Sequence, residues 1–152
     1  MGSREKVEEF LSKSGVTFEL REFGESTKNS ALAAQALGCT VAEIAKSVVF
    51  VGKAPYVVII SGDKKVNPQR LAVAAGEPVR IANPQEVREK TGFPIGGVPP
   101  FPHEKGVLVF TDSSLVRFDS IWAAAGTPNT VFRMRVVDLL RLLGSEAHDL
   151  SM

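Results

Sequence analysis

Apolar and polar residues follow each other along this chain first with the period of a helix and then with the period of a strand. Val7, Phe10 and Leu11 recur at the spacing of one helical face, and Gly15 ends the pattern. The segment 17–23 opens with alternating apolar and charged residues, which is typical of a strand with one buried face. The chain is therefore predicted to begin with a helix and a strand.

Two more helices are predicted before the middle of the chain. Ser30–Leu37 is rich in alanine and ends at Gly38, a residue type that commonly terminates helices. Thr40 and Glu43 have the spacing of a capping box, in which the hydroxyl and the carboxylate each accept a backbone N–H. We expect this box to open a short helix that ends at Lys46.

Turn and cap residues mark most of the remaining elements. The β-rich runs 47–51 and 56–61 are separated by four residues that include a glycine and a proline, which predicts a β-hairpin. Asn67-Pro68 and Asn83-Pro84 each place a capping asparagine before a proline that suits the first helical turn. These signals and the apolar pattern predict helices over 68–75, 84–91 and 136–143, and strands over 79–82, 107–111, 118–124 and 130–134.

The order of these elements predicts an α+β fold in a single compact domain over residues 1–152. We expect a mixed central β-sheet flanked by helices, because strands and helices alternate without a repeat or a linker. Hydrophobic residues make up 44% of the 152 residues, enough for a sizeable core without disulfide or metal support. Residues 145–152 carry no periodic pattern and are expected to fray.

Charge balance and the scarcity of cysteine and histidine exclude several classes of function. The chain has 18 Lys and Arg against 17 Asp and Glu, a net charge of +1, so any contact with nucleic acid must be local. Cys39 is the single cysteine, and His103 and His148 lie far apart, so neither an internal disulfide nor a Cys/His zinc site is expected. We expect no metal and no cofactor. No signal peptide or membrane-spanning run is visible, and a cytoplasmic protein is expected.

Common catalytic motifs are absent, and Lys46 is the first of two unusual features. The chain has no G-x-S-x-G nucleophile elbow and no G-x-G-x-x-G nucleotide loop. Lys46 stands directly before the apolar run 48–51, at the predicted end of a helix. A lysine interacting with the helix dipole and an anion-binding ammonium both suit this position, and the first is the more common case.

The second unusual feature is Gly96-Gly97-Val98-Pro99-Pro100, inside a loop rich in glycine and proline. Adjacent glycines free the backbone to turn its N–H groups to one side, and the prolines stiffen the segment after them. Such a loop can bring amides to an oxyanion or a carbonyl oxygen. A purely structural turn is an equal alternative. His103 lies in the same loop, and we expect it to be exposed to solvent rather than to act as an acid or base.

Several landmarks, taken in order and spacing, are similar to those of one known family. They are 30–38, 44–50, 57–60, Ser61-Gly62-Asp63, Lys65-Val66-Asn67, Thr91-Gly92-Phe93, 96–100 and Asp112. On these residues the chain resembles the YbaK/ProX family of aminoacyl-tRNA deacylases, free-standing relatives of the editing domain inserted in many bacterial prolyl-tRNA synthetases. The lysine before the apolar strand and the G-x-x-x-P loop are together the specific part of the resemblance. It implies a compact mixed sheet flanked by helices.

The resemblance also implies a reaction and a role for each landmark. Members hydrolyse the ester that joins a wrong amino acid to the terminal adenosine of a tRNA. Lys46 is implied to hold the 3′ end of the substrate. The loop residues Gly96, Gly97, Val98, Pro99 and Pro100 are implied to place backbone amides around the aminoacyl carbonyl, while water positioned by the substrate's ribose hydroxyl attacks without an enzyme nucleophile. The residues expected to bind the substrate are Phe23, Thr27, Ser30, Ser61, Gly62, Asp63, Lys65, Gly126 and Asn129.

The segment 124–130 departs from part of the family. Some members that remove alanine carry a His-Pro-hydrophobic segment shortly before an Asn-Thr pair. Here Asn129-Thr130 is present and the histidine is absent. The amino acid removed is therefore left open among Cys, Ala, Ser, Thr and a somewhat larger residue.

Two functions from different classes remain. The first is a trans-acting deacylase for a mischarged tRNA, with tRNA-Pro as the expected substrate. Its expected partner is the tRNA acceptor end, and a prolyl-tRNA synthetase is a candidate second partner. The alternative is a non-catalytic module that binds the aminoacyl-tRNA 3′ end or a nucleotide. Lys46 and the intact 96–100 loop favour the enzyme.

Overall fold

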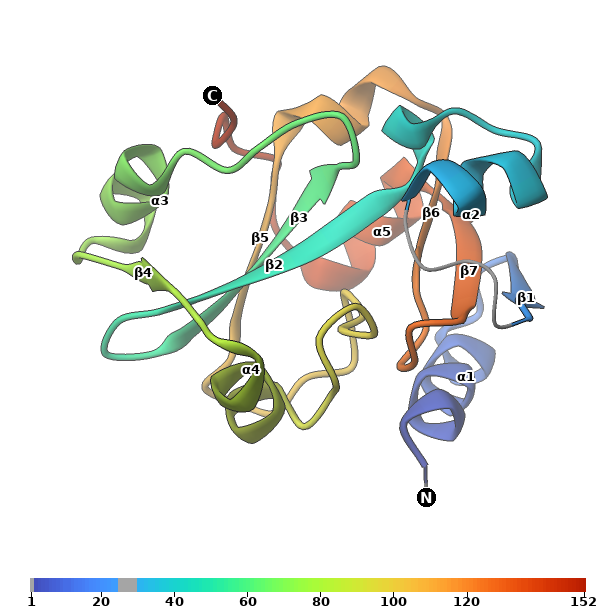
Figure 1. Cartoon of the computed structure of the whole chain (residues 1–152), viewed down its shortest axis with the longest axis horizontal. Coiled ribbons are helices and arrows are strands. Elements are labelled where there is room, and N and C mark those ends of the chain that lie inside the picture. The colour runs from blue at the N-terminus through green and yellow to red at the C-terminus, as the bar shows by residue number, and fades with distance from the viewer. Residues whose placement is uncertain (1, 25–29) are drawn as a thin grey trace.

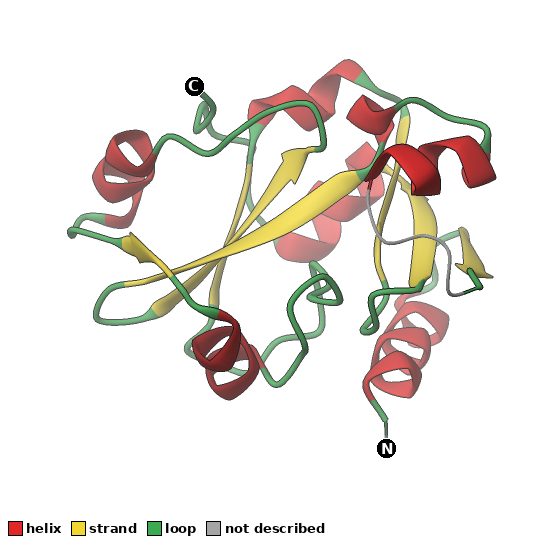
Figure 2. Cartoon of the chain, viewed as in Figure 1, coloured by secondary structure: helices red, strands yellow, loops and turns green. Residues whose placement is uncertain are grey.

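The computed structural model describes residues 2–24 and 30–152, and its elements follow the predicted order (Figures 1 and 2). The helices are α1 (Ser3–Ser14), α2 (Ser30–Leu37), α3 (Pro68–Ala75), α4 (Pro84–Thr91) and α5 (Val136–Leu143). The strands are β1 (Phe18–Glu22), β2 (Ala45–Val51), β3 (Pro55–Ser61), β4 (Arg80–Ile81), β5 (Leu108–Thr111), β6 (Ser120–Ala124) and β7 (Thr130–Arg135). Two short 3₁₀ helices are η1 (Val41–Glu43) and η2 (Ser113–Arg117). None of the helices in the described part of the chain is long and apolar enough to cross a membrane.

The strands form two sheets, and the chain is a single compact α+β domain, as predicted. One sheet has the order β1-β7-β6 with antiparallel pairs throughout. The other has the order β4-β2-β3-β5 and is mixed, because β5 pairs with β3 in parallel. A parallel bridge between Ile44 and Trp122 links the start of β2 to β6, so the expected central sheet is divided but continuous at this point. The helices lie around the two sheets (Figure 1).

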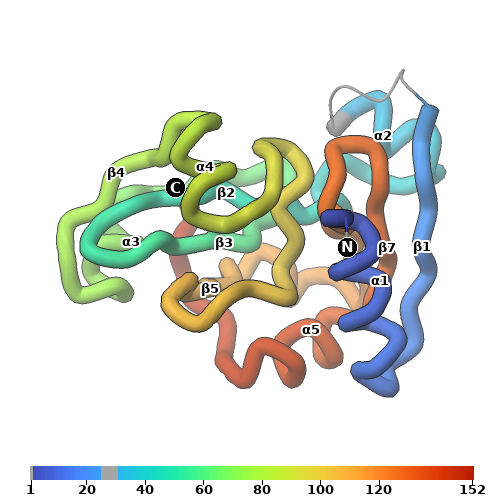
Figure 3. The backbone as a smooth tube through the Cα atoms, turned by 90° about the horizontal axis from the view of Figure 1, so that it is seen from below, coloured from blue at the N-terminus to red at the C-terminus, as the bar shows by residue number. Residues whose placement is uncertain are grey.

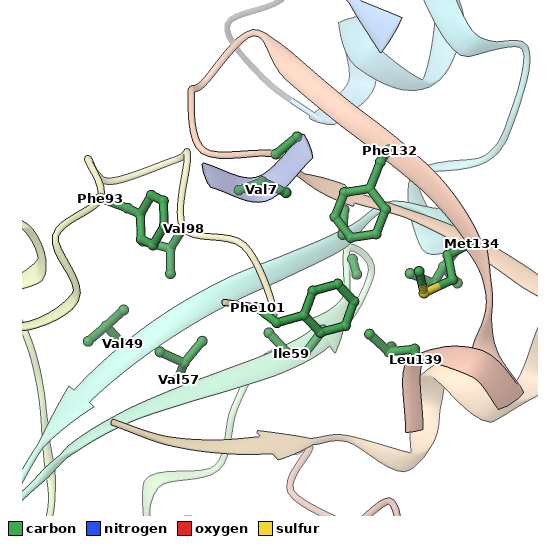
Figure 4. Packing of buried hydrophobic residues seen from close by; sticks show 14 of the residues in the cluster. Val7, Val49, Val57, Ile59, Phe93, Val98, Phe101, Phe132, Met134 and Leu139 are labelled. Carbon is green, nitrogen blue, oxygen red and sulfur yellow. The ribbon is translucent and has the colours of Figure 1, made fainter. Parts of the chain in front are cut away.

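The largest hydrophobic cluster contains residues of both sheets and holds them together (Figure 4). Val7 and Leu11 of α1 are fully buried in it, as the helical spacing predicted. Ile59 of β3, Phe132 of β7 and Leu139 of α5 are buried in the same cluster. Removal of this apolar surface from water is the main favourable contribution to folding.

The predicted hairpin and both asparagine caps are confirmed. β2 pairs with β3 along its whole length. The Asn67 side chain accepts the Gln69 N–H at 3.0 Å, and the Asn83 side chain accepts the Glu86 N–H at 2.8 Å. Each asparagine thereby satisfies an N–H group that the helix itself leaves unpaired.

The predicted helix from Thr40 to Lys46 is wrong. The capping box is present, with the Thr40 N–H and hydroxyl both donating to Glu43 Oε1 at 3.0 Å, but it opens only the single turn η1. Lys46 lies in β2, opposite Ile60 of β3. The β-branched run that follows gains a full ladder of hydrogen bonds with β3, which a short helix cannot match.

The C-terminal residues pack onto the domain instead of fraying as expected. Leu150 is 1% exposed, its carbonyl accepts the Asn67 N–H at 2.7 Å, and its N–H donates to Asp112 Oδ1 at 2.7 Å. The Met152 N–H donates to the Lys65 carbonyl at 3.0 Å. The Leu150 N–H donates to a buried carboxylate that is distant in the sequence, so no local pattern predicts this contact.

Candidate active site

Lys46 is a half-buried cation on the face of β2 that points away from the main core. It shares one face of the strand with Val48 and Phe50, which pack in a different hydrophobic cluster from Val49 on the opposite face. Burial lowers the pKa of the Lys46 ammonium and the nearby Lys65 charge lowers it further, while a neighbouring carboxylate opposes the shift. No described residue pairs with this ammonium by hydrogen bond or ion pair. A partly desolvated cation without a partner is suited to bind an anion.

The turn after β3 brings Ser61, Gly62 and Asp63 beside the strand that carries Lys46. Gly62 packs so closely that an added Cβ would lie 2.4 Å from the Val41 carbonyl oxygen and 2.8 Å from that of Ile44. Only glycine permits this approach of two backbone segments. The turn is therefore fixed against the residues that lead into β2.

Arg117 of η2 holds this turn, and the sequence did not point to it. Its guanidinium donates to Asp63 Oδ1 at 2.9 Å, to Asp63 Oδ2 at 3.4 Å and to Ser61 Oγ at 2.9 Å. The hydrogen bonds that Asp63 accepts, that of Arg117 first and that of Ser61 next, lower the pKa of its carboxyl to about 2. Arg117 lies 54 residues after Asp63, so no local motif could have identified it.

The 96–100 loop is packed rather than exposed, and its amides differ in availability. The Gly97 N–H donates to the Pro94 carbonyl at 2.9 Å, and Gly96 has the left-handed φ of 83° that closes this tight turn. Gly97 is therefore not a free donor, contrary to the expectation for this residue. The N–H groups of Gly96 and Val98 have no acceptor within the described ranges, although Val98 is only 2% exposed.

The same loop packs against the turn 126–129 that joins β6 to β7 (Figure 3). A Cβ on Gly97 would lie 2.8 Å from Thr127 Cα, and a Cβ on Gly126 would lie 2.5 Å from the Ser3 carbonyl oxygen. Gly126 also has a φ of 98°, which side-chain-bearing residues rarely adopt. The two glycines allow the loop, the turn and the start of α1 to stack closely.

His103 is partly buried and makes a hydrogen bond to the 96–100 loop, so the expectation of a solvent-exposed histidine is wrong. Its Nε2–H donates to the Pro99 carbonyl at 2.7 Å, and its ring meets the edge of Phe93 at 5.6 Å between centroids. Burial lowers the pKa of His103 and outweighs the Pro99 hydrogen bond, so the neutral ring is favoured. The opposite nitrogen, Nδ1, is buried without a hydrogen-bond partner among described residues.

Phe23, which follows β1, and Asn129, which precedes β7, meet at the start of β7. The Phe23 N–H donates to the Asn129 carbonyl at 2.7 Å, and the Asn129 side-chain amide donates to the Phe23 carbonyl at 3.4 Å. The Phe23 ring packs against the cluster that contains Trp122, which also gives it a core role. Thr27 lies outside the described residues, and Ser30 is described only as the first residue of α2.

The expected site residues thus form two groups. Lys46, the 61–63 turn and Lys65 make the first, and the 96–100 loop with the 126–129 turn makes the second. β2 and β6 run in the same direction from their bridge and diverge, with the loop after α4 between them (Figure 1). Within the described part of the chain no hydrogen bond or ion pair joins the groups, but Val98 shares a hydrophobic cluster with Ala45, the neighbour of Lys46.

Two surface hollows lie away from both groups. One, of about 490 Å³, is lined by one face of α1 with Pro102 and Leu142. The other, of about 550 Å³, lies beside the end of α5. Among the residues that the structure describes, no three His, Cys, Asp or Glu side chains gather as metal ligands.

Known proteins are similar to this chain along most of its length. Residues 24–142 match the family described as the aminoacyl-tRNA editing domain. The uncharacterised YwhH protein of Bacillus subtilis (strain 168) is 33% identical over 123 residues, which cover 80% of this chain and 78% of that protein. Lys46, the 61–63 turn, the 96–100 loop and the 126–129 turn all fall within the matched range.

Solved structures share the whole fold. A crystal structure described as that of a candidate trans-editing enzyme for prolyl-tRNA synthetase superimposes with a TM-score of 0.91 at 38% identity, covering 100% of this chain and 98% of that one. The crystal structure of hypothetical protein APE2540 superimposes with a TM-score of 0.90 at 32% identity, covering 97% of this chain and 99% of that one. The similarity therefore includes both groups of site residues.

Proposed function

This chain belongs to the aminoacyl-tRNA editing domain family, and on that premise we propose that it is a trans-acting deacylase of mischarged tRNA. The bond hydrolysed is the ester between a wrong amino acid and the terminal adenosine. Similarity to a candidate trans-editing enzyme for prolyl-tRNA synthetase supports tRNA-Pro as the substrate and that synthetase as a partner. The reaction belongs in the cytoplasm, where aminoacyl-tRNA is used.

The observation that carries the proposal is the half-buried, unpaired ammonium of Lys46 in a chain of this family. Its position beside Lys65 supports binding of a phosphate near the 3′ end of the RNA. A charge-assisted bond in a partly desolvated place is stronger than one in open water. Lys46 therefore anchors the end of the substrate, and Lys65 adds a second, exposed contact.

The 96–100 loop supplies the chemistry in this proposal. Water attacks the ester carbonyl, the carbonyl oxygen takes up negative charge, and the carbon–oxygen bond to the ribose then breaks. The free N–H groups of Gly96 and Val98 suit that developing charge, whereas the Gly97 N–H is engaged in its own turn. The leaving ribose oxygen takes a proton, and the products are the free amino acid and uncharged tRNA.

The amino acid removed is proposed to be small. Gly126 and Thr127 line the turn where some relatives that remove alanine carry histidine, so Cys, Ala, Ser and Thr all remain candidates. Pockets for small side chains discriminate weakly, since one methylene is worth about 1–3 kcal/mol. We expect turnover of more than one of these amino acids.

A deacylation assay on tRNA-Pro charged with Cys, Ala, Ser, Thr or Pro tests the proposal. The wild-type chain is expected to release at least one of the four non-proline amino acids. Lys46→Ala is expected to lower kcat/KM about 100-fold or more, the scale of losing one group that holds the transition state. Lys53→Ala is the matched control, because Lys53 is exposed at the far end of the same hairpin, and it is expected to change kcat/KM less than about twofold.

The alternative binding module gives a different result in the same experiment. Its signature is tRNA binding that depends on Lys46 without release of any amino acid. Equal activity of Lys46→Ala and wild type would contradict the role proposed for the lysine.

A further inference from the structure

A carboxylate lies near Lys46 without pairing to it. Asp63 follows the strand that pairs with the Lys46 strand, and its charge acts on the pKa of Lys46. An unpaired carboxylate beside a half-buried ammonium is expected to form an ion pair with it. Asp63 does not form this ion pair with Lys46 because other groups already bind its carboxylate.

Both oxygens of Asp63 are occupied. Arg117 reaches Oδ1 at 2.9 Å and Oδ2 at 3.4 Å, and the Ser61 hydroxyl donates to Oδ1 at 2.8 Å. The two-point contact of a planar guanidinium fixes the direction of the carboxylate, which a single contact does not.

Arg117 is itself held in place by groups outside the turn. Its Nε–H donates to the Ser114 carbonyl at 2.7 Å, and its guanidinium carbon lies 4.9 Å from the centre of the Phe118 ring. The Ser114 N–H donates in turn to Asp112, a fully buried side chain. The position of the Arg117 guanidinium is therefore set by contacts toward the core as well as by Asp63.

The local charges show what this arrangement achieves. Asp63 and Arg117 neutralise each other, which leaves the ammonium groups of Lys46 and Lys65 as excess positive charge. If Asp63 paired with Lys46 instead, the net charge of these four groups would not change, but the Lys46 ammonium would be occupied and the free charge would move to Arg117. Whether Asp63 pairs with Arg117 or with Lys46 therefore decides whether the Lys46 ammonium can accept an anion.

We propose that Arg117 is a positioning residue that holds Asp63 away from Lys46 and so keeps the Lys46 ammonium free for a substrate phosphate. This gives Asp63 a role different from the direct substrate contact expected of it. The nature of the anion rests on the proposed function. The competition between Arg117 and Lys46 for Asp63 rests only on the contacts within this chain.

The first test needs no substrate. The pKa of the Lys46 side chain is measured by NMR titration in wild type, Arg117→Gln, Asp63→Asn and the double variant. Arg117→Gln is expected to raise this pKa, because a released carboxylate favours the charged ammonium. Asp63→Asn is expected to lower it, and the double variant is expected to follow Asp63→Asn. An unchanged Lys46 pKa in Arg117→Gln overturns the proposal.

The second test measures deacylation of the mischarged tRNA. Arg117→Gln is expected to raise KM about tenfold with kcat nearly unchanged, the scale of weakening one bond to a charged group. Adding Asp63→Asn to that variant is expected to restore KM to within about threefold of wild type, because the competing carboxylate is gone. A merely structural arginine predicts a double variant no better than Arg117→Gln, and that result contradicts the proposal.

Two further variants guard against misfolding and nonspecific charge effects. Arg117→Lys keeps the positive charge but loses the two-point contact of the guanidinium, and its KM is expected to lie between those of wild type and Arg117→Gln. Arg80→Gln is the matched control, because Arg80 makes a comparable two-point contact with Glu86 at 2.9 and 2.7 Å outside both site groups. If wild type shows no deacylation, the proposed function fails, while the Lys46 pKa series still decides the role of Arg117.

Discussion

Individual side chains of the site differ in whether a partner already holds them. Lys46 has none among described residues, whereas Asp63 accepts bonds from both Arg117 and Ser61. The same contrast separates the Val98 N–H from that of Gly97, which donates within its own turn. Groups left without partners are the ones able to bind a ligand, because a ligand then replaces water rather than an internal bond.

His103 gives a prediction about pH and stability. Its buried ring has a pKa below the ordinary value of about 6.5, so the unfolded chain binds a proton before the folded chain does. The free energy of unfolding is therefore expected to fall as pH drops below about 6.5 and to level off once the folded form also takes up the proton. Urea unfolding of wild type at about pH 7.5, 6.5 and 5.5 measures this trend.

The variant His103→Phe isolates the contribution of the ring. At about pH 7.5 it is expected to lower the free energy of unfolding by about 1–2 kcal/mol, because the Pro99 carbonyl loses its donor. The difference in the free energy of unfolding between His103→Phe and wild type is expected to become smaller as pH falls. His148→Gln is the control for the loss of an exposed histidine. A difference in the free energy of unfolding between His103→Phe and wild type that grows in acid would contradict the assignment.

At the scale of elements, local signals were sufficient wherever the stabilising partner is local. The asparagine caps act on N–H groups two or three residues away, and both helices begin where the Asn-Pro pairs predicted. The Thr40–Glu43 capping box is also present, but the helix expected after it gives way to β2. Pairing with β3 is a longer-range interaction, and it decides the secondary structure of Lys46.

The C-terminal segment yields a prediction of its own. Leu150 is 1% exposed and packs with Val66 and Leu71, so Leu150→Ala is expected to lower the free energy of unfolding by about 2–4 kcal/mol. Met152→Ala is the control, because Met152 is 71% exposed and a change below about 0.5 kcal/mol is expected. Chemical denaturation of both variants is the measurement. Equal stability of Leu150→Ala and wild type would mean that the segment frays in solution.

At the scale of the whole molecule, two diverging strands and one loop frame the proposed site. β2 and β6 diverge from each other beyond the Ile44–Trp122 bridge. The 96–100 loop contacts the turn that follows β6. Gly97 permits this contact, and Gly126 permits the close approach of the start of α1 to the same turn, because a Cβ at either position would meet neighbouring backbone within 3.0 Å. The arrangement depends on the fit between segments that are far apart in the chain.

The nearly balanced charge of the molecule predicts a weak dependence of tRNA binding on salt. With a net charge of +1 and two lysines at the site, we expect about two phosphate contacts and a slope of log K against log salt of about −1 to −2. Binding measured between about 50 and 300 mM KCl gives this slope, and Lys46→Ala should reduce its magnitude by about 0.7–0.9. A slope steeper than about −5 would indicate a broad basic surface and contradict the local contact.

The sequence by itself determined the order of the elements, the caps, the hairpin, the α+β class and the landmarks of the family. Each of these depends on neighbours in the chain or on the identity of a few residues in order. Only the tertiary structure decided that Lys46 lies on a strand, that the Gly97 amide is engaged and that Arg117 holds Asp63. It also decided that the C-terminal segment binds the domain through Asp112, Asn67 and Lys65. Those outcomes depend on hydrogen bonds and close contacts between residues distant in sequence, which form only when the chain is folded and which no local pattern encodes.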